Sequence, residues 1–159
     1  MFLYIMDMAF ILLLVLAIYL ATKISVADMR RRIIPDAYLF PLLIIGIIIT
    51  TFFPWPHEIG AGAIGMTFGY ILAAVTGLIF DRIITRKNPT ADAPIGMGDI
   101  KLIAVGGMWG GTCGLAIGLV LACIFGAAWA YYKKQKFIPF APFFIIGEFL
   151  ALIAIAFLI

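Results

Sequence analysis

The sequence has little charge and few residues of the kinds that bind metals. Of its 159 residues only 12% are charged, and it contains two cysteines and one histidine. An ordinary soluble domain carries roughly 25% charged residues, so this composition nearly excludes a water-soluble globule. Cys113 and Cys123 would lie about 15 Å apart on one continuous helix, too far for a disulfide. The composition therefore indicates neither a disulfide framework nor a zinc knuckle.

Apolar residues, in contrast, make up 65% of the chain, and its mean hydropathy is +1.20. A helix that spans a bilayer needs about 20 apolar residues. Apolar runs, separated by charges, Pro or Gly, cover residues 3–22, 36–53, 60–80, 100–112, 114–131 and 139–159. This pattern predicts an all-α, polytopic membrane protein with about six transmembrane helices in a single domain, residues 1–159. Gly110, Gly111 and Gly114 around Thr112 favour a break after the fourth run. The alternatives are one long tilted helix over 100–131 or a short re-entrant piece joined to a full span.

The eleven Lys and Arg residues fall into three groups. They are Lys23 with Arg30, Arg31 and Arg32; Arg82, Arg86, Lys87 and Lys101; and Lys133, Lys134 and Lys136. Because Lys and Arg concentrate in cytoplasmic loops, a six-helix topology would place all three groups on the cytoplasmic side and both termini outside. Membrane topology therefore explains the net charge of +3, and we expect no nucleic-acid partner.

Most other polar and small residues have structural explanations. We expect five of the eight acids to be solvated, ion-paired or interfacial: Asp7, Glu58, Asp81, Asp92 and Glu148. His57 is expected to be solvated in a short outer loop, because a metal site needs several convergent ligands. Small residues recur at four-residue spacing, which lets helices pack closely in lipid. They are Ala61, Gly65 and Gly69, then Gly106, Gly110, Gly114 and Gly118.

The remaining acids, Asp28, Asp36 and Asp99, lie at the predicted cytoplasmic ends of helices. Taken alone, Asp99 could be an N-cap and Asp28 a partner for the adjacent arginines. Their placement on one membrane face, with glycines beside Asp99, favours a different interpretation. Two carboxylates in contact cannot both ionise, so a pair that shares one proton can activate water.

Three segments carry a resemblance to a known family. Residues 96–102 (GMGDIKL) resemble its GxGD motif, and residues 28–36 (DMRRRIIPD) resemble the segment around its first aspartate. Residues 138–143 (IPFAPF) are similar to its Pro-Phe-Gly-Pro-Phe stretch, with Ala141 in place of Gly. The chain thus resembles the type IV prepilin peptidases, which are membrane-embedded aspartic proteases.

The resemblance implies removal of the short leader from prepilins or pseudopilins at the cytoplasmic face of the inner membrane. Asp28 and Asp99 would be the catalytic pair, and hydrolysis by a carboxylate pair needs no metal or organic cofactor. Gly96, Gly98, Lys101, Pro35 and Asp36 would shape the site. We expect Arg30, Arg31 and Arg32 to contact an acidic residue of the substrate or anionic membrane lipid.

Many members of that family carry an N-terminal region with paired CxxC cysteines, which is linked to N-methylation of the product. We expect a short form without that region, and its methyltransferase activity stays open. An archaeal preflagellin peptidase would use the same chemistry on another substrate. A signal-peptide-peptidase relative is disfavoured, because those proteins usually have Tyr where Ala27 stands. The alternative outside enzymes is a membrane carrier that binds a cation or protons at the two aspartates.

Overall fold

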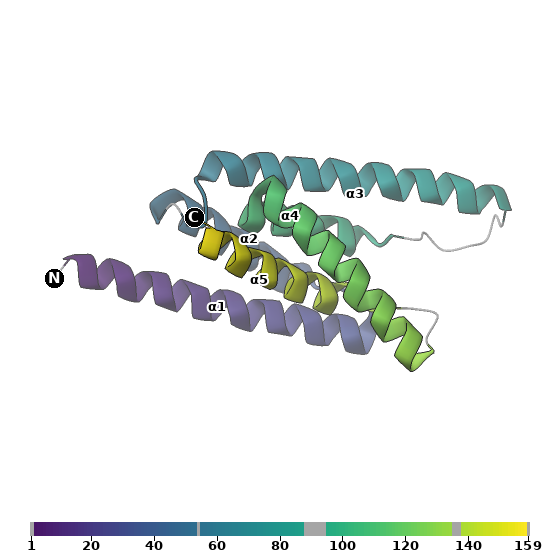
Figure 1. Ribbon diagram of the computed structural model, residues 1–159, viewed down its shortest axis with the longest axis horizontal. Helices are drawn as coiled ribbons and strands as arrows, with labels where there is room; N and C mark the ends of the chain where they lie inside the picture. The colour runs from purple at the N-terminus through teal and green to yellow at the C-terminus, as the bar shows by residue number, and fades with distance from the viewer. Residues whose placement is uncertain (1, 54, 88–94, 135–137, 159) are drawn as a thin grey trace.

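The computed structural model describes residues 2–53, 55–87, 95–134 and 138–158, and these form helices and short connections without strands. Figure 1 shows five helices: α1 (Phe2–Arg31), α2 (Asp36–Phe52), α3 (Ile59–Lys87), α4 (Met97–Lys133) and α5 (Phe140–Leu158). Four of them, α1, α3, α4 and α5, are long and apolar enough to cross a membrane, and α2 is shorter. The predicted all-α class is confirmed.

Helix α4 turns back on itself at Gly111, whose φ of 62° and ψ of −166° are not helical. Glu148 Oε1 lies 3.1 Å from the place that a Cβ would take at Gly106 and 2.7 Å from the same place at Gly118. On a straight helix these glycines would be about 18 Å apart, so the two halves of α4 run side by side. The predicted break is confirmed, and the six apolar runs correspond to six helical segments.

The reversal brings the helix ends that carry the basic groups to one end of the molecule. The C-termini of α1 and α3, the N-termini of α2 and α5, and both ends of α4 lie toward the right of Figure 1. This is the arrangement that six segments predict. Lys136 and Asp92 lie outside the described residues, and the side of the membrane that this end faces stays a prediction.

The apolar interior forms a floor directly beneath this charged end. Ile24, Leu102 and Phe144 are almost completely buried. Each of them lies one helical turn away from the charged end, in α1, α4 and α5 respectively. Residues three or four apart share a helix face, so each packs on the same face as a residue at the end of its helix. The core therefore fixes the positions of these three ends relative to one another.

His57 is half-buried, so the expectation of a solvated histidine is wrong. Its Nε2 lies 3.1 Å from the carbonyl oxygen of Trp109, and its Nδ1 lies 3.1 Å from that of Glu58. A helix that ends leaves its last four carbonyl groups without intrahelical partners. The imidazole thus provides a partner for a carbonyl that the break at Gly111 releases.

Close glycine contacts join α3 to α4, as their four-residue spacing predicts. A Cβ at Gly65 or at Gly107 would overlap the backbone of the other helix, and one at Gly69 would lie 3.0 Å from the Ile103 carbonyl oxygen. Gly106 and Gly118, however, adjoin a carboxyl group. For these two glycines, close packing between helices is therefore only part of the explanation.

We predict that Gly111→Ala destabilises the protein by about 1–3 kcal/mol, because a side chain strains a backbone with positive φ. The measurement is the free energy of unfolding in detergent. Gly60→Ala is the matched control, since nothing lies within 4 Å of a Cβ there and alanine favours helix. Equal loss of stability in both variants would contradict the role of Gly111.

Candidate active site

Asp28 is fixed by the start of another helix. It lies in the last turns of α1 and is only 5% exposed. Its Oδ2 accepts a hydrogen bond of 2.8 Å from the backbone N–H of Ala141, which is in the first turn of α5. The first N–H groups of a helix have no intrahelical partner and favour a negative charge. The start of α5 therefore both orients this carboxylate and stabilises its charge.

Asp99 is held by the start of its own helix. The N-cap of α4 is Gly96, with extended backbone angles of φ −71° and ψ 149°. Asp99 stands three residues later, and its Oδ2 accepts a hydrogen bond of 3.2 Å from the N–H of Gly96. The alternative that Asp99 is itself the N-cap is therefore wrong, although its carboxylate does cap the helix from the third position.

Both aspartates line one cavity of about 310 Å³ at the charged end of the molecule. The two carboxylates are near enough to interact electrostatically. We call this the catalytic cavity, after the role that is proposed for it below, and its residues come from the three segments that the motifs mark. They are Asp28, Arg32, Ile33, Ile34, Gly96, Gly98, Asp99, Ile138, Pro139 and Phe140.

The connection between α1 and α2 forms one wall of the catalytic cavity. Arg32 adopts a left-handed backbone (φ 54°), its N–H donates to the carbonyl oxygen of Asp28 at 2.9 Å, and its side chain interacts electrostatically with Asp28. A Cβ at Gly98 would lie 2.9 Å from that of Ile34, so glycine lets α4 begin close to this connection. Pro35 is the N-cap of α2, as predicted.

An ion pair joins the starts of α2 and α4 beside the catalytic cavity. Lys101 Nζ lies 2.7 Å and 3.0 Å from the two carboxylate oxygens of Asp36. The Lys101 ammonium therefore points toward Asp36. The ion pair connects the start of α2, which follows the segment of Asp28, with the start of α4, which holds Asp99. Arg30 and Arg31 are exposed in the last turn of α1 and do not line the cavity.

The Ala141 amide and the wall formed by residues 138–140 were not predicted as parts of the site. The sequence does contain a signal for this donor. Pro139 and Pro142 mark the start of an apolar helix, and the first N–H groups of a helix have no partner within it. In the part of the chain that the structure describes, no three His, Cys, Asp or Glu side chains converge as metal ligands would. The expectation about cofactors stays a prediction.

Comparison with known proteins adds to this geometry. A relative from Pseudomonas putida, named prepilin leader peptidase/N-methyltransferase, is 28% identical over 137 residues, which are 82% of this chain and 45% of that protein. One of the same name from Aeromonas salmonicida is 30% identical over 149 residues, 87% of this chain and 49% of that protein. The chain thus spans about half the length of these curated relatives. No solved structure gives a significant match.

A family model, described as the type IV leader peptidase family, matches residues 8–131. The match contains Asp28, Asp99 and the whole of α2 and α3. It ends before the start of α5, which supplies the Ala141 amide to Asp28. Because the match covers most of the sequence, the chain belongs to the type IV leader peptidase family.

Proposed function

We propose that this protein is an aspartic endopeptidase that removes the leader of type IV prepilins or pseudopilins at the cytoplasmic face of the inner membrane. The observation that carries the proposal is the meeting of Asp28 and Asp99, from separate helices, in one cavity. The names of the relatives support the substrate class. In this proposal, residues 1–159 form one transmembrane peptidase domain. The proposed reaction is the hydrolysis of a peptide bond alone.

The aspartate pair would act as a general base and a general acid. The ionised carboxylate accepts a proton from water as the water oxygen attacks the scissile carbonyl carbon, and the protonated one hydrogen-bonds to the carbonyl oxygen. The tetrahedral intermediate collapses, the C–N bond breaks, and the amide nitrogen takes a proton from the pair. Hydrogen bonds from Ala141 and Gly96 hold the carboxylates in place before substrate arrives, which lowers the cost of reaching this geometry.

We predict that Asp28→Asn and Asp99→Asn each lower kcat for prepilin cleavage by about 1,000-fold or more. Asn keeps the size and part of the hydrogen bonding but removes the ionisable group. The measurement is cleavage of a purified prepilin in detergent or lipid. Glu58→Gln is the control, because it makes the same chemical change at an exposed acid. Normal cleavage by both Asp variants would direct attention to cation transport instead.

The Asp36–Lys101 ion pair is proposed to position the two aspartates. Each of the changes Asp36→Lys and Lys101→Asp puts like charges next to each other, so we expect about a tenfold lower kcat. The double variant restores an opposite-charge pair, and we expect it to recover to within about threefold of wild type, since residues in direct contact act together. Failure of the double variant to recover would show that one residue acts independently of the pair.

Arg30 and Arg31 are proposed to contact an acidic residue of the substrate or anionic lipid. The leader is itself basic, so attraction to the leader does not explain a basic rim. We predict that the variant Arg30→Glu/Arg31→Glu raises KM several-fold and changes kcat less. Kinetics in zwitterionic detergent and in anionic lipid separate the two partners. An unchanged KM in both media would contradict the proposed contact of these arginines.

A further inference from the structure

The catalytic cavity has an exposed mouth and a buried base. Four of its lining residues are exposed: Arg32 and Ile33 in the connection between α1 and α2, Gly96 at the start of α4, and Ile138 just before α5. Asp28, in contrast, is only 5% exposed. A scissile bond that reaches this carboxylate therefore brings the neighbouring substrate residues beside the mouth.

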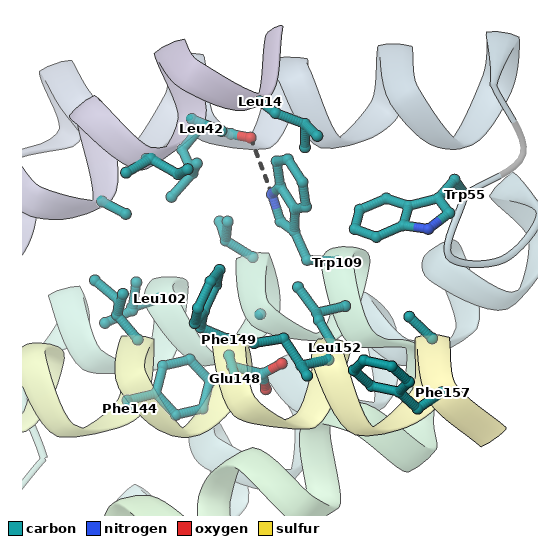
Figure 2. Close-up of a pocket in the computed structure, with 18 residues that line it drawn as sticks. Leu14, Leu42, Trp55, Leu102, Trp109, Phe144, Glu148, Phe149, Leu152 and Phe157 are labelled. Atoms are coloured by element: carbon teal, nitrogen blue, oxygen red, sulfur yellow. Dashed lines mark hydrogen bonds between the residues drawn. The ribbon is translucent and has the colours of Figure 1, made fainter. Parts of the chain in front are cut away.

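A second cavity lies deeper in the protein and is separate from the catalytic cavity. It has a volume of about 290 Å³ and lies between α1, α2, α4 and α5 (Figure 2). Leu102 and Phe144 line it at the end nearest the start of α5, and both are almost completely buried. These two side chains close the base of the catalytic cavity. Contacts with residues next to the cleaved bond are therefore confined to the catalytic cavity.

Glu148 adjoins the second cavity, but its carboxyl group is closed to a substrate. The residue is 6% exposed, and among the described residues neither carboxyl oxygen has a hydrogen-bond partner. The oxygens lie 2.7–3.1 Å from the places that a Cβ would take at Gly106, Gly110 and Gly118. The carboxyl group thus packs inside the protein, and the expectation that Glu148 is solvated, ion-paired or interfacial is wrong.

Two branched apolar side chains stand at the mouth of the catalytic cavity. Ile33 is 61% exposed and Ile138 is 42% exposed. Each belongs to a segment that contacts Asp28: the N–H of Arg32 donates to its carbonyl oxygen, and the N–H of Ala141 donates to its carboxylate. Since three residues of extended chain span at most about 10 Å, both isoleucines lie near the catalytic carboxylate. Exposed apolar surface of this kind gains free energy when another apolar group covers it.

The charges around the cavity do not favour a charged substrate side chain at the mouth. In the part of the chain that the structure describes, the charged residues of the lining are Asp28, Asp99 and Arg32, and Arg32 interacts with Asp28. Lys101 is paired with Asp36 outside the lining. A basic side chain would approach the Arg32 guanidinium, and an acidic one would approach the aspartates, so both would meet a like charge. An apolar side chain meets no such repulsion and can cover the isoleucines.

We propose that Ile33 and Ile138 bind an apolar side chain of the substrate next to the cleaved bond and so determine specificity at that position. This inference rests on the proposed peptidase function. Leucine has three more carbon atoms than alanine. Covering them in part at an open mouth corresponds to about a three- to tenfold preference in kcat/KM.

The test is a substrate series with Ala, Asn or Leu at each of the two positions that flank the cleaved bond. Wild type should prefer Leu over both Ala and Asn by about three- to tenfold at one of these positions. Ile33→Thr and Ile138→Thr keep the branched shape that suits an extended backbone but remove apolar surface. We expect each to lose most of the preference, and Ile33→Val and Ile138→Val to retain it. Cleavage of the Ala substrate should change less than twofold.

Met97→Thr is the matched control for these variants. Met97 is 63% exposed at the start of α4, next to Gly96, but it does not line the catalytic cavity. We expect this variant to keep the full preference for Leu. A purely structural role of the isoleucines would lower cleavage of all substrates by the same factor. That result, or equal cleavage of the Leu and Ala substrates by wild type, would overturn the proposal.

Photo-crosslinking tests the location without catalysis. The probe is a substrate peptide with a reduced, uncleavable bond at the cleavage position and p-benzoylphenylalanine beside it. We expect its crosslinks to form at residue 33 or 138 and not at Met97. Crosslinks that miss both isoleucines would overturn the proposal. If wild type cleaves no substrate, the peptidase function fails, whereas crosslinks at these isoleucines still support the proposed apolar contact.

Discussion

Lipid offers no hydrogen bonds, so a helix that breaks inside a membrane must find other partners for the backbone groups it frees. Helix α4 breaks at Gly111, and the rest of the structure depends on how this break is accommodated. His57 reaches the freed carbonyl oxygen of Trp109, and glycine contacts bring α3 tightly against the first half of α4. Because the break is stabilised in this way, α4 can return, so that its N-terminus lies beside Asp28 and its second half lies beside the start of α5.

The geometry of the aspartate pair is then set by helix ends rather than by the core alone. Asp28 is held by an amide of α5, Asp99 by an amide at the start of α4, and the Asp36–Lys101 ion pair joins the neighbouring helix starts. These three interactions, two of them between residues far apart in the sequence, together fix the helix ends around one cavity. Unpaired N–H groups at helix starts provide the stabilisation of negative charge that a carboxylate pair needs.

Much of the fold and of the site could be predicted from the sequence, because the strongest signals lie within short stretches of the chain. The apolar runs, the break near Gly111 and the grouping of basic residues follow from hydropathy and charge. Asp28 and Asp99 were singled out by their motifs, and the structure brings them together. The Ala141 amide and the burial of Glu148 could not be predicted, since both depend on which helix faces meet after the chain has folded. His57 was misjudged for the same reason, because its partner lies in another helix.

The shortness of the first half of α4 has a consequence for how the chain is made. Residues 97–110 extend about 21 Å as a helix, which is less than the roughly 30 Å of a bilayer core. Such a segment is a poor substrate for insertion on its own as it leaves the ribosome. It should wait at the membrane surface and enter together with the longer second half as a helical hairpin, so that both halves of α4 are integrated in one step.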